Sequence, residues 1–203
     1  MSQRRQGEQP PAMTKLETHR MNPLRTLGYT AAALAVTPIL EYGWHHLIAH
    51  GRRADPTRET HLEHHRSAYT VMNPWEEMRE NAPVVGGAIL AVTAGLGLLL
   101  GARRAIAAGA GLAAGYALTT VYHAKMHERG PRTAYERWMW RFHWHHHAAD
   151  ARVNFGLTNP ALDFVFGTAV VPDEVEVPAR LAPEWLRNEG APGIRVRAEE
   201  AHA

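Results

Sequence analysis

R-F-H-W-H-H-H-A-A-D-A-R-V-N, residues 141–154, is the stretch that decides how the rest of the chain has to fold. Its His143, His146 and His147 stand at i, i+3 and i+4, and on a helix this spacing puts three imidazoles on one face. Neutral imidazole is a common protein ligand for zinc, copper, iron and nickel. The stretch therefore predicts a helix with a metal-binding face.

Three further histidine clusters occur along the chain. H-L-E-H-H, residues 61–65, repeats the i, i+3, i+4 spacing, and two looser pairs stand at i+5 and i+4. The histidines of the four clusters are His45, His50, His61, His64, His65, His123, His127, His143, His146 and His147. A structural zinc site needs only about four ligands, so this set is large enough for two metal ions and too large for one. Dispersed surface histidines are the alternative, and four clusters in one chain argue against it.

The composition narrows the chemistry of such a site. The chain has 203 residues, enough for one domain and a short tail, and no cysteine, which excludes disulfides, thiolate zinc sites and iron–sulfur clusters. The formal net charge of +2 is spread along the chain and gives no case for nucleic-acid binding. The mean hydropathy of −0.33 averages a polar half with a very apolar half.

Two uncharged stretches in the middle of the chain predict a membrane helical hairpin. Residues 82–101 lack any charge and have the length that the core of a bilayer requires. A basic turn at 103–104 leads into a second uncharged run, 105–122. Two pairs of glycines have the small-xxx-small spacing that lets helices approach closely, namely Gly97 with Gly101 and Gly111 with Gly115. A buried hairpin of a soluble protein is the alternative.

The regions before and after the hairpin define three expected parts. Residues 1–23 are polar and predict a disordered lead-in, and 24–171 form the membrane domain, whose first apolar segment we expect to be interrupted or kinked at Pro38. Basic residues precede that segment, so a secretory signal is the alternative. Residues 172–203 contain four prolines and many charges, which predict a flexible soluble tail that tolerates truncation after Pro178.

The hairpin returns the chain to the side of the membrane from which it came. The second and third histidine clusters flank it and should therefore lie at the same membrane face. Fifteen of the 22 Lys and Arg residues lie in 45–82 and 123–203, which places this face in the cytoplasm. The expected fold is all-α, an integral-membrane helical bundle with a histidine-rich cap on the cytoplasmic side. A helix over residues 133–151, rich in Trp and Arg, should lie at the membrane interface.

With its motifs in this order, the chain resembles the fatty acid hydroxylase superfamily, the histidine-rich membrane diiron oxygenases that include sterol desaturases and carotenoid hydroxylases. E-Y-G-W-H-H-L-I-A-H at 41–50 is similar to the opening E-Y-x-x-H-R-x-x-x-H of that family. H-L-E-H-H resembles its second box and H-A-K-M-H at 123–127 its third. R-F-H-W-H-H-H, with the N-F-G and D-F-V-F-G-T that follow, resembles its last box and closing motif. The resemblance covers about residues 24–170.

The resemblance implies that the ten clustered histidines bind two non-haem iron ions, with no catalytic side chain beyond these ligands. Zinc would replace iron on purification, since zinc binds such sites more tightly than ferrous iron. His46 stands where the family has Arg, so His46 is an alternative to His45 as the first ligand. Glu41 is expected to hydrogen-bond the His45 imidazole and fix its tautomer. Weaker candidates for supporting residues are Asp150, Asn154 and Asp163.

The implied reaction is hydroxylation of a lipid, a fatty-acyl or sphingolipid-type chain, with O₂ and two electrons from a separate electron-donor protein. A carotenoid ring hydroxylase or a sterol-type desaturase is the alternative within the superfamily. A histidine-rich metal transporter or metal-binding membrane protein is the alternative from another class. Transporters place polar ligands inside their spanning segments, however, and the two uncharged runs of the hairpin contain no histidine.

Overall fold

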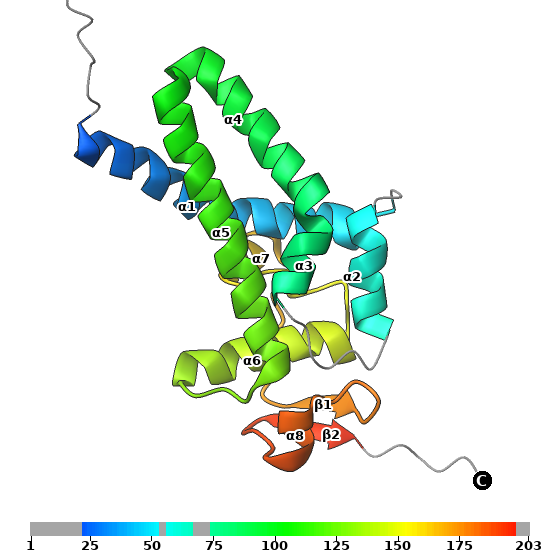
Figure 1. Cartoon of the computed structure of the whole chain (residues 1–203). Coiled ribbons are helices and arrows are strands. Elements are labelled where there is room, and N and C mark those ends of the chain that lie inside the picture. Colours follow the sequence, from blue (N-terminus) through cyan, green and yellow to red (C-terminus); the bar gives the residue numbers. More distant parts are fainter. Residues whose placement is uncertain (1–21, 53–55, 67–73, 198–203) are drawn as a thin grey trace, which may run out of the picture.

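The computed structural model describes residues 22–52, 56–66 and 74–197. In this part of the chain three long helices dominate, α1 (Pro23–Trp44), α4 (Gly87–Leu100) and α5 (Ala102–Glu128). Figure 1 shows α4 and α5 as an antiparallel hairpin that projects from the rest of the molecule. The chain reverses at Gly101, whose φ of 84° is readily adopted only by glycine. The predicted hairpin is therefore present, and the predicted lead-in falls almost entirely outside the described residues.

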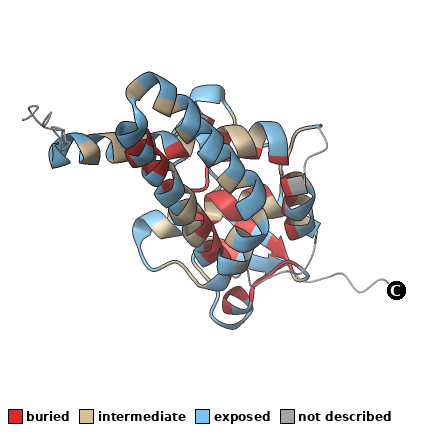
Figure 2. Ribbon diagram, turned by 45° about the horizontal axis from the view of Figure 1, so that its top comes forward, coloured by how far each residue is buried: buried red, intermediate tan, exposed pale blue. Residues whose placement is uncertain are grey.

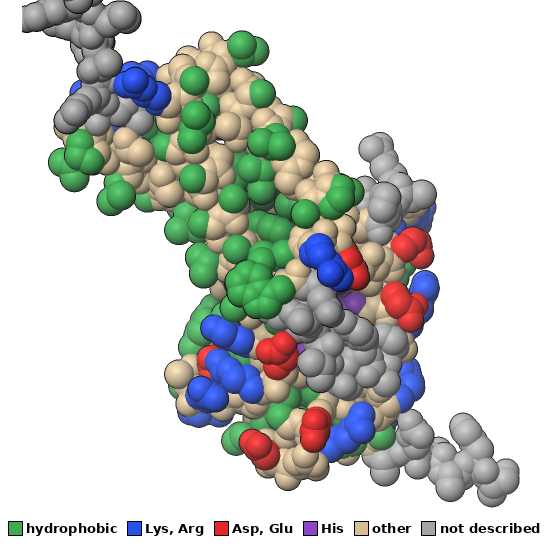
Figure 3. Space-filling model, viewed as in Figure 1, with side chains coloured by type: hydrophobic (Ala, Val, Ile, Leu, Met, Phe, Trp, Pro, Cys, Tyr) green, Lys and Arg blue, Asp and Glu red, His purple; other side chains and the backbone are tan. Residues whose placement is uncertain are grey.

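Two helices in the described residues are long and apolar enough to cross a membrane, Met78–Leu100 and Ala102–Glu128. The first of them joins the end of α3 (Pro74–Asn81), the π-helical segment η2 (Ala82–Gly86) and α4. Its apolar side chains face outward; Leu98, for example, is 90% exposed. Figure 3 shows hydrophobic side chains over the hairpin and most charged side chains at the opposite end of the molecule. Two contrasting surfaces of this kind are what a protein inserted in a membrane presents.

Helix α1 packs along α5, and the glycines of α5 allow this close approach. A side chain at Gly111 would collide with the carbonyl of Thr30, and one at Gly115 would collide with Thr37. The close approach that the spacing of these two glycines predicted is therefore found, and the helix that approaches is α1. Pro38 does not interrupt α1, which continues to Trp44. Figure 2 shows the buried residues gathered where these helices meet the elements that follow, while α4 is largely exposed.

A π-helical segment, η1 (His45–Ala49), follows α1 directly and corrects the spacing of the first histidine pair. On an α-helix of 3.6 residues per turn, residues five apart point about 140° away from each other. In η1 the N–H of His50 instead bonds to the carbonyl of His45, at 3.1 Å. This wider turn brings the fifth residue back over the first. Both imidazoles can therefore face the same point.

The remaining helices of the histidine region are α2 (Pro56–Arg66), α6 (Ala134–Ala148) and α7 (Ala161–Phe166). Thr133 caps α6 by accepting a hydrogen bond from the N–H of Glu136. The prediction that α6 lies at the membrane interface through its tryptophans is wrong for Trp140 and Trp144. Both indoles are buried, at 0% and 2% exposure, because they pack into an apolar core between α6 and the residues that follow position 173.

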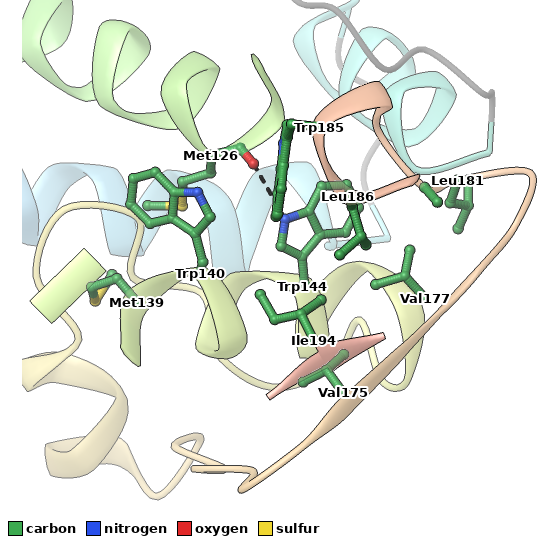
Figure 4. Close-up of a cluster of buried hydrophobic side chains, with 11 residues drawn as sticks. Met126, Met139, Trp140, Trp144, Val175, Val177, Leu181, Trp185, Leu186 and Ile194 are labelled. Carbon is green, nitrogen blue, oxygen red and sulfur yellow. Dashed lines mark hydrogen bonds between the residues drawn. The ribbon is translucent and has the colours of Figure 1, made fainter. Parts of the chain in front are cut away.

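That core is completed by the last described residues, 173–197, which we call the C-terminal unit. They form β1 (Val175–Pro178), α8 (Glu184–Asn188) and β2 (Ile194–Arg197), with the two strands parallel and Val175 opposite Ile194. Figure 4 shows Trp185 and Leu186 of α8 against Trp144 of α6. The prediction of a flexible tail over 172–203 is wrong for these residues. The fold is mostly helical, as predicted, but a short two-stranded sheet replaces the strictly all-α expectation.

Candidate metal centre

Four structural elements carry the ten clustered histidines, and all four meet beside the end of α5 that lies away from the hairpin turn. The segment after α1 supplies His45 and His50, α2 supplies His61, His64 and His65, the last turns of α5 supply His123 and His127, and α6 supplies His143, His146 and His147. The structure thus brings together imidazoles that are up to about a hundred positions apart in the chain. They form two groups.

The first group consists of five imidazoles. The ring nitrogens of His45, His50, His61, His65 and His146 that could bind a metal all lie within 4.8 Å of one another. The Nε2 atom of His61 is 3.0 Å from that of His45, 3.0 Å from that of His50 and 3.1 Å from that of His65. Adjacent ligands about 2.1 Å from one cation stand about 3 Å apart. The spacing therefore fits a single ion.

The second group is built in the same way around His127. The ring nitrogens of His64, His123, His127 and His147 lie within 4.8 Å of one another. The Nε2 atom of His127 is 3.2 Å from that of His64, 3.3 Å from that of His123 and 2.8 Å from that of His143. His143 lies against this group, since its ring also contacts those of His123 and His147. All ten histidines predicted as ligands lie in or against one of the two groups.

The two groups adjoin each other. The rings of His65, from the first group, and His147, from the second, stack with their centroids 4.0 Å apart. His64 and His65, neighbours on α2, belong to different groups and have centroids 6.0 Å apart. The arrangement offers two neighbouring metal sites, separated by the stacked rings of His65 and His147.

Burial keeps these imidazoles neutral, which is the form that binds a metal. Loss of solvent lowers the pKa of His61, His64 and His143 well below the ordinary value, and repulsion by neighbouring histidines lowers it further. Burial also lowers the pKa of His65, to about 3. The donor sets are therefore ready to bind a cation at neutral pH without first losing protons.

Two backbone carbonyls orient rings of the first group. The Nδ1 atom of His45 lies 2.5 Å from the oxygen of Phe155, and the Nδ1 atom of His146 lies 2.6 Å from the oxygen of Val153. A carbonyl only accepts, so each Nδ1 carries the proton and each Nε2 keeps its lone pair for a metal. Both carbonyls belong to residues 153–171, which we call the closing segment.

Glu41 holds the closing segment from α1. Its buried carboxylate accepts hydrogen bonds from the N–H of Leu157 at 2.5 Å and from the N–H and hydroxyl of Thr158 at 3.0 and 2.6 Å. Thr119 of α5 donates a further bond at 3.0 Å. The expectation that Glu41 would bond the His45 ring is therefore corrected: the partner of that ring is the Phe155 carbonyl, and Glu41 fixes the segment that carries it.

Asp163 holds the same segment from α7. Its carboxylate accepts from the N–H groups of Phe155 and Gly156, both at 2.8 Å, and from the hydroxyl of Thr168 at 2.8 Å. A carboxylate that accepts two successive backbone N–H groups fixes the direction of the chain between them. Asp163 thereby helps to aim the Phe155 carbonyl at His45.

Asn154 sets the bend between the two carbonyls. Its φ of 60° is a left-handed conformation that Asn tolerates better than most residues, and its side chain is fully buried. The amide nitrogen donates to the oxygens of Phe142 and Val170, and the amide oxygen accepts from the N–H of Val170. Asn154 thus ties the closing segment to α6.

Asp150 and His46 lie outside both groups. Asp150 forms an ion pair with Arg152 at 2.9 Å and accepts its backbone N–H, so the expected support of a metal ligand is not found there. The ring of His46 stacks on Phe155, with centroids 4.4 Å apart, and meets the edge of Tyr42. His45, which lies in the first group, is therefore the better candidate of the two for the first ligand.

Two tryptophans that the sequence did not single out as supporting residues brace His127. The indole N–H of Trp185 donates to the backbone oxygen of His127 at 3.1 Å. Trp144 donates to the oxygen of Met126 at 3.2 Å, and its ring lies 5.0 Å from the His127 ring. The position of Trp144 inside the W-H-H-H run was a usable signal. Nothing in the local sequence around Trp185 indicates its contact.

The donor set fits a first-row transition metal. The buried Nε2 atoms of His146 and His147 have no hydrogen-bond partner, although each lies among other imidazoles. A buried ring nitrogen without a partner is costly unless it binds something, and a cation would satisfy all of these lone pairs together. All-imidazole sites without carboxylates suit zinc, copper, nickel and iron and do not suit calcium or magnesium.

The fold is similar to one solved structure, described as full-length scs7p with only the hydroxylase domain visible. The match has a TM-score of 0.58 and 24% sequence identity, and covers 74% of this chain. The chain spans 58% of the length of that protein chain, and the likeness concerns the fold. No curated protein matches this sequence closely enough to count as a relative.

A sequence model of the fatty acid hydroxylase family matches residues 30–168. These residues run from α1 to the end of the closing motif and include all ten clustered histidines, Glu41, Asn154 and Asp163. The family that the sequence motifs indicated is thereby confirmed. The chain belongs to the fatty acid hydroxylase family.

Proposed function

We propose that this protein is a membrane-bound, non-haem diiron oxygenase that hydroxylates a fatty-acyl or sphingolipid-type chain. The observation that carries the proposal is the convergence of nine imidazoles into two adjoining groups, with His143 against the second, and with neighbouring Nε2 atoms about 3 Å apart, the spacing expected around a cation. One ion would be held by the group around His61 and the other by the group around His127.

The reaction needs an oxidant that no side chain can supply. An unactivated C–H bond resists acid–base catalysis, and bound iron would supply the O₂-dependent oxidation that breaks it. In the overall balance, O₂, two electrons, two protons and the lipid C–H yield a C–OH group and one water. We propose that the two electrons come from a separate donor protein.

The residues of the chain prepare the site for this chemistry. The closing segment fixes the tautomers of His45 and His146 through the carbonyls of Phe155 and Val153. The walls exclude bulk water, since His45, His143 and His146 are at most 1% exposed. Exclusion of water favours reaction of the oxidant with a lipid chain over side reactions with water.

The exposed apolar hairpin supports insertion in a membrane, with the histidine groups at the end of α5 that leaves the bilayer. The excess of Lys and Arg on that side supports a cytoplasmic location. A lipid substrate can then reach the site without leaving the membrane region altogether.

The test combines metal analysis, oxygen uptake and lipid profiling. We expect the purified protein to hold about two metal ions, and cells that express it with an electron donor to accumulate a hydroxylated lipid that mass spectrometry detects. His64→Ala and His146→Ala should each lose the product while the protein still inserts in the membrane. Metal movement across vesicles without oxygen consumption would instead identify a transporter and refute the proposal.

A further inference from the structure

The closing segment presents an apolar surface that the metal centre does not use. Residues 155–171 contain one charged side chain, Asp163, and it is fully buried. On α7 and just after it, Phe164, Val165 and Phe166 are 56%, 72% and 64% exposed, and Val170 and Val171 are 38% and 48% exposed. Three consecutive bulky apolar side chains in water form a patch that soluble surfaces avoid. We call these five residues the α7 patch.

The α7 patch continues the exposed apolar face of α1. The ring of Phe166 stacks on that of Tyr42, with centroids 5.5 Å apart, and the Tyr42 hydroxyl lies 3.0 Å from that of Thr168. Nearby along the chain, Ile39 and Leu40 are 55% and 53% exposed. Figure 1 shows α7 beside α1 and between the hairpin and α6. The end of α1 and α7 are therefore exposed to the same environment, either water or lipid.

We propose that the α7 patch is buried in the bilayer at the level of the lipid headgroups and upper acyl chains, so that α7 is an interfacial helix. This inference rests on the membrane insertion proposed above. A lipid surface is the occupant that fits, because the patch exposes no charged side chain to orient a protein partner and is continuous with α1, which packs on the spanning helix α5.

The placement has a consequence for the metal centre. Phe166 contacts Tyr42, Tyr42 contacts Phe155 at 6.0 Å, and Phe155 contacts the ring of His45 at 5.5 Å. A row of aromatic rings thus connects the α7 patch to the first histidine group. Lipid that touches α7 lies three ring contacts away from a proposed metal ligand.

The chain contains no cysteine, so a single introduced cysteine gives a unique labelling site. Val165→Cys, labelled with the fluorophore NBD and reconstituted in phosphatidylcholine nanodiscs, reports on contact with lipids that carry a nitroxide quencher near the headgroup or deep in the acyl chain. Leu90→Cys on the exposed face of α4 is the matched spanning position, and Glu176→Cys, at the exposed residue of the otherwise buried strand β1, is the matched aqueous position. Val171→Cys tests the patch at a second point.

We expect the shallow quencher to remove roughly half of the emission from position 165 or 171, the deep quencher to act more strongly at 90, and neither to act at 176. Quenching at 90 without quenching at 165 or 171 would overturn the interfacial placement and leave membrane insertion intact. Absence of lipid quenching at all four positions would overturn insertion itself. A blue-shifted label at 165 that no lipid quenches would identify a protein contact, such as a second copy, and would also refute the inference.

Discussion

The closing segment and the C-terminal unit both follow the last histidine cluster, and both brace metal-binding candidates, but they do so by opposite means. The closing segment touches imidazole nitrogens directly and is held by buried polar groups, chiefly Glu41 and Asp163. The C-terminal unit reaches only the backbone of His127, through Trp185, and is held by apolar packing. Polar support should govern how the site binds a metal, whereas apolar support should govern whether the site forms at all.

Truncation after Pro178 gives the largest expected effect. It removes Trp185, Leu186 and Ile194 and exposes the buried indoles of Trp140 and Trp144. Loss of one such tryptophan alone costs about 3–5 kcal/mol, so we expect the truncated chain to fail to fold. Size-exclusion chromatography of the detergent extract would report aggregation. A monodisperse truncated protein with full metal content would restore the interpretation as a dispensable tail.

Acid should destabilise the histidine groups and leave the C-terminal unit unaffected. In the unfolded chain imidazoles bind protons below about pH 6.5. In the folded chain burial holds the pKa of His65 at about 3, so the unfolded state binds more protons between these values. The free energy of unfolding of the metal-free protein should therefore fall as pH drops through this window.

Thermal unfolding between pH 7 and 5 measures this slope. It should be smaller in His65→Phe, which removes one partly buried imidazole, and unchanged in Trp185→Ala, because the C-terminal core does not titrate there. Equal slopes in His65→Phe and the unaltered protein would show that these imidazoles do not control acid stability.

Trp185→Ala should lower the free energy of unfolding by about 3–5 kcal/mol through the lost packing. Trp185→Phe should lower it by only about 1 kcal/mol, since it keeps most of the packing and loses the hydrogen bond to the backbone of His127. In both variants the fraction that folds should hold as much metal as the unaltered protein. A folded variant that has lost one ion would mean that the C-terminal unit also sets the geometry of the second group.

Asp163→Asn should show the reverse behaviour. The weaker hydrogen bonds cost about 1.5–3 kcal/mol of stability at most. Because the Phe155 carbonyl loses its fixed direction, metal affinity of the first group should fall by about 10-fold to 100-fold. Competition with a chelator measures the change, and Asp150→Asn, whose carboxylate contacts Arg152 instead, is the matched control. The same affinity in both variants would separate the closing segment from metal binding.

His46→Ala gives the smallest expected effect. Its ring packs on Phe155 and supplies no nitrogen to either group, so about two metal ions should remain bound, whereas His45→Ala should lose one. Elemental analysis of the two purified variants decides the question. Loss of an ion from His46→Ala alone would exchange the roles of these neighbours.

The sequence predicts the histidine set because i, i+3 and i+4 spacing has a direct meaning on a helix. It does not predict how that set divides. His61 and His65 face the first group while His64 faces the second, and His146 is separated in the same way from His143 and His147. The division depends on how α2 and α6 pack against each other, and no local pattern encodes that.

Some of the residues that support the site can be recognised from the sequence, and others cannot. Asn154 and Asp163 are recognisable because they stand in N-F-G and D-F-V-F-G-T, which resemble the closing motif of the family. The C-terminal unit is not recognisable from the sequence. Prolines and charges conceal the alternation of the buried Val175 and Val177, and the residue that Trp185 contacts, His127, lies 58 residues away. The sequence predicted that the glycine pair of α5 allows close packing. The structure was needed to identify the helix that packs there, which is α1.

The π-turn at η1 shows why a more regular backbone would make a worse protein here. Deleting one residue between His45 and His50 would let the segment relax into an ordinary α-helix with better backbone geometry. The two imidazoles would then stand at i and i+4 but would be rotated relative to α2 and α6. The first group would lose the two ligands that the segment after α1 supplies. An engineer who idealised this turn for robustness would remove the very irregularity that aims the first two rings.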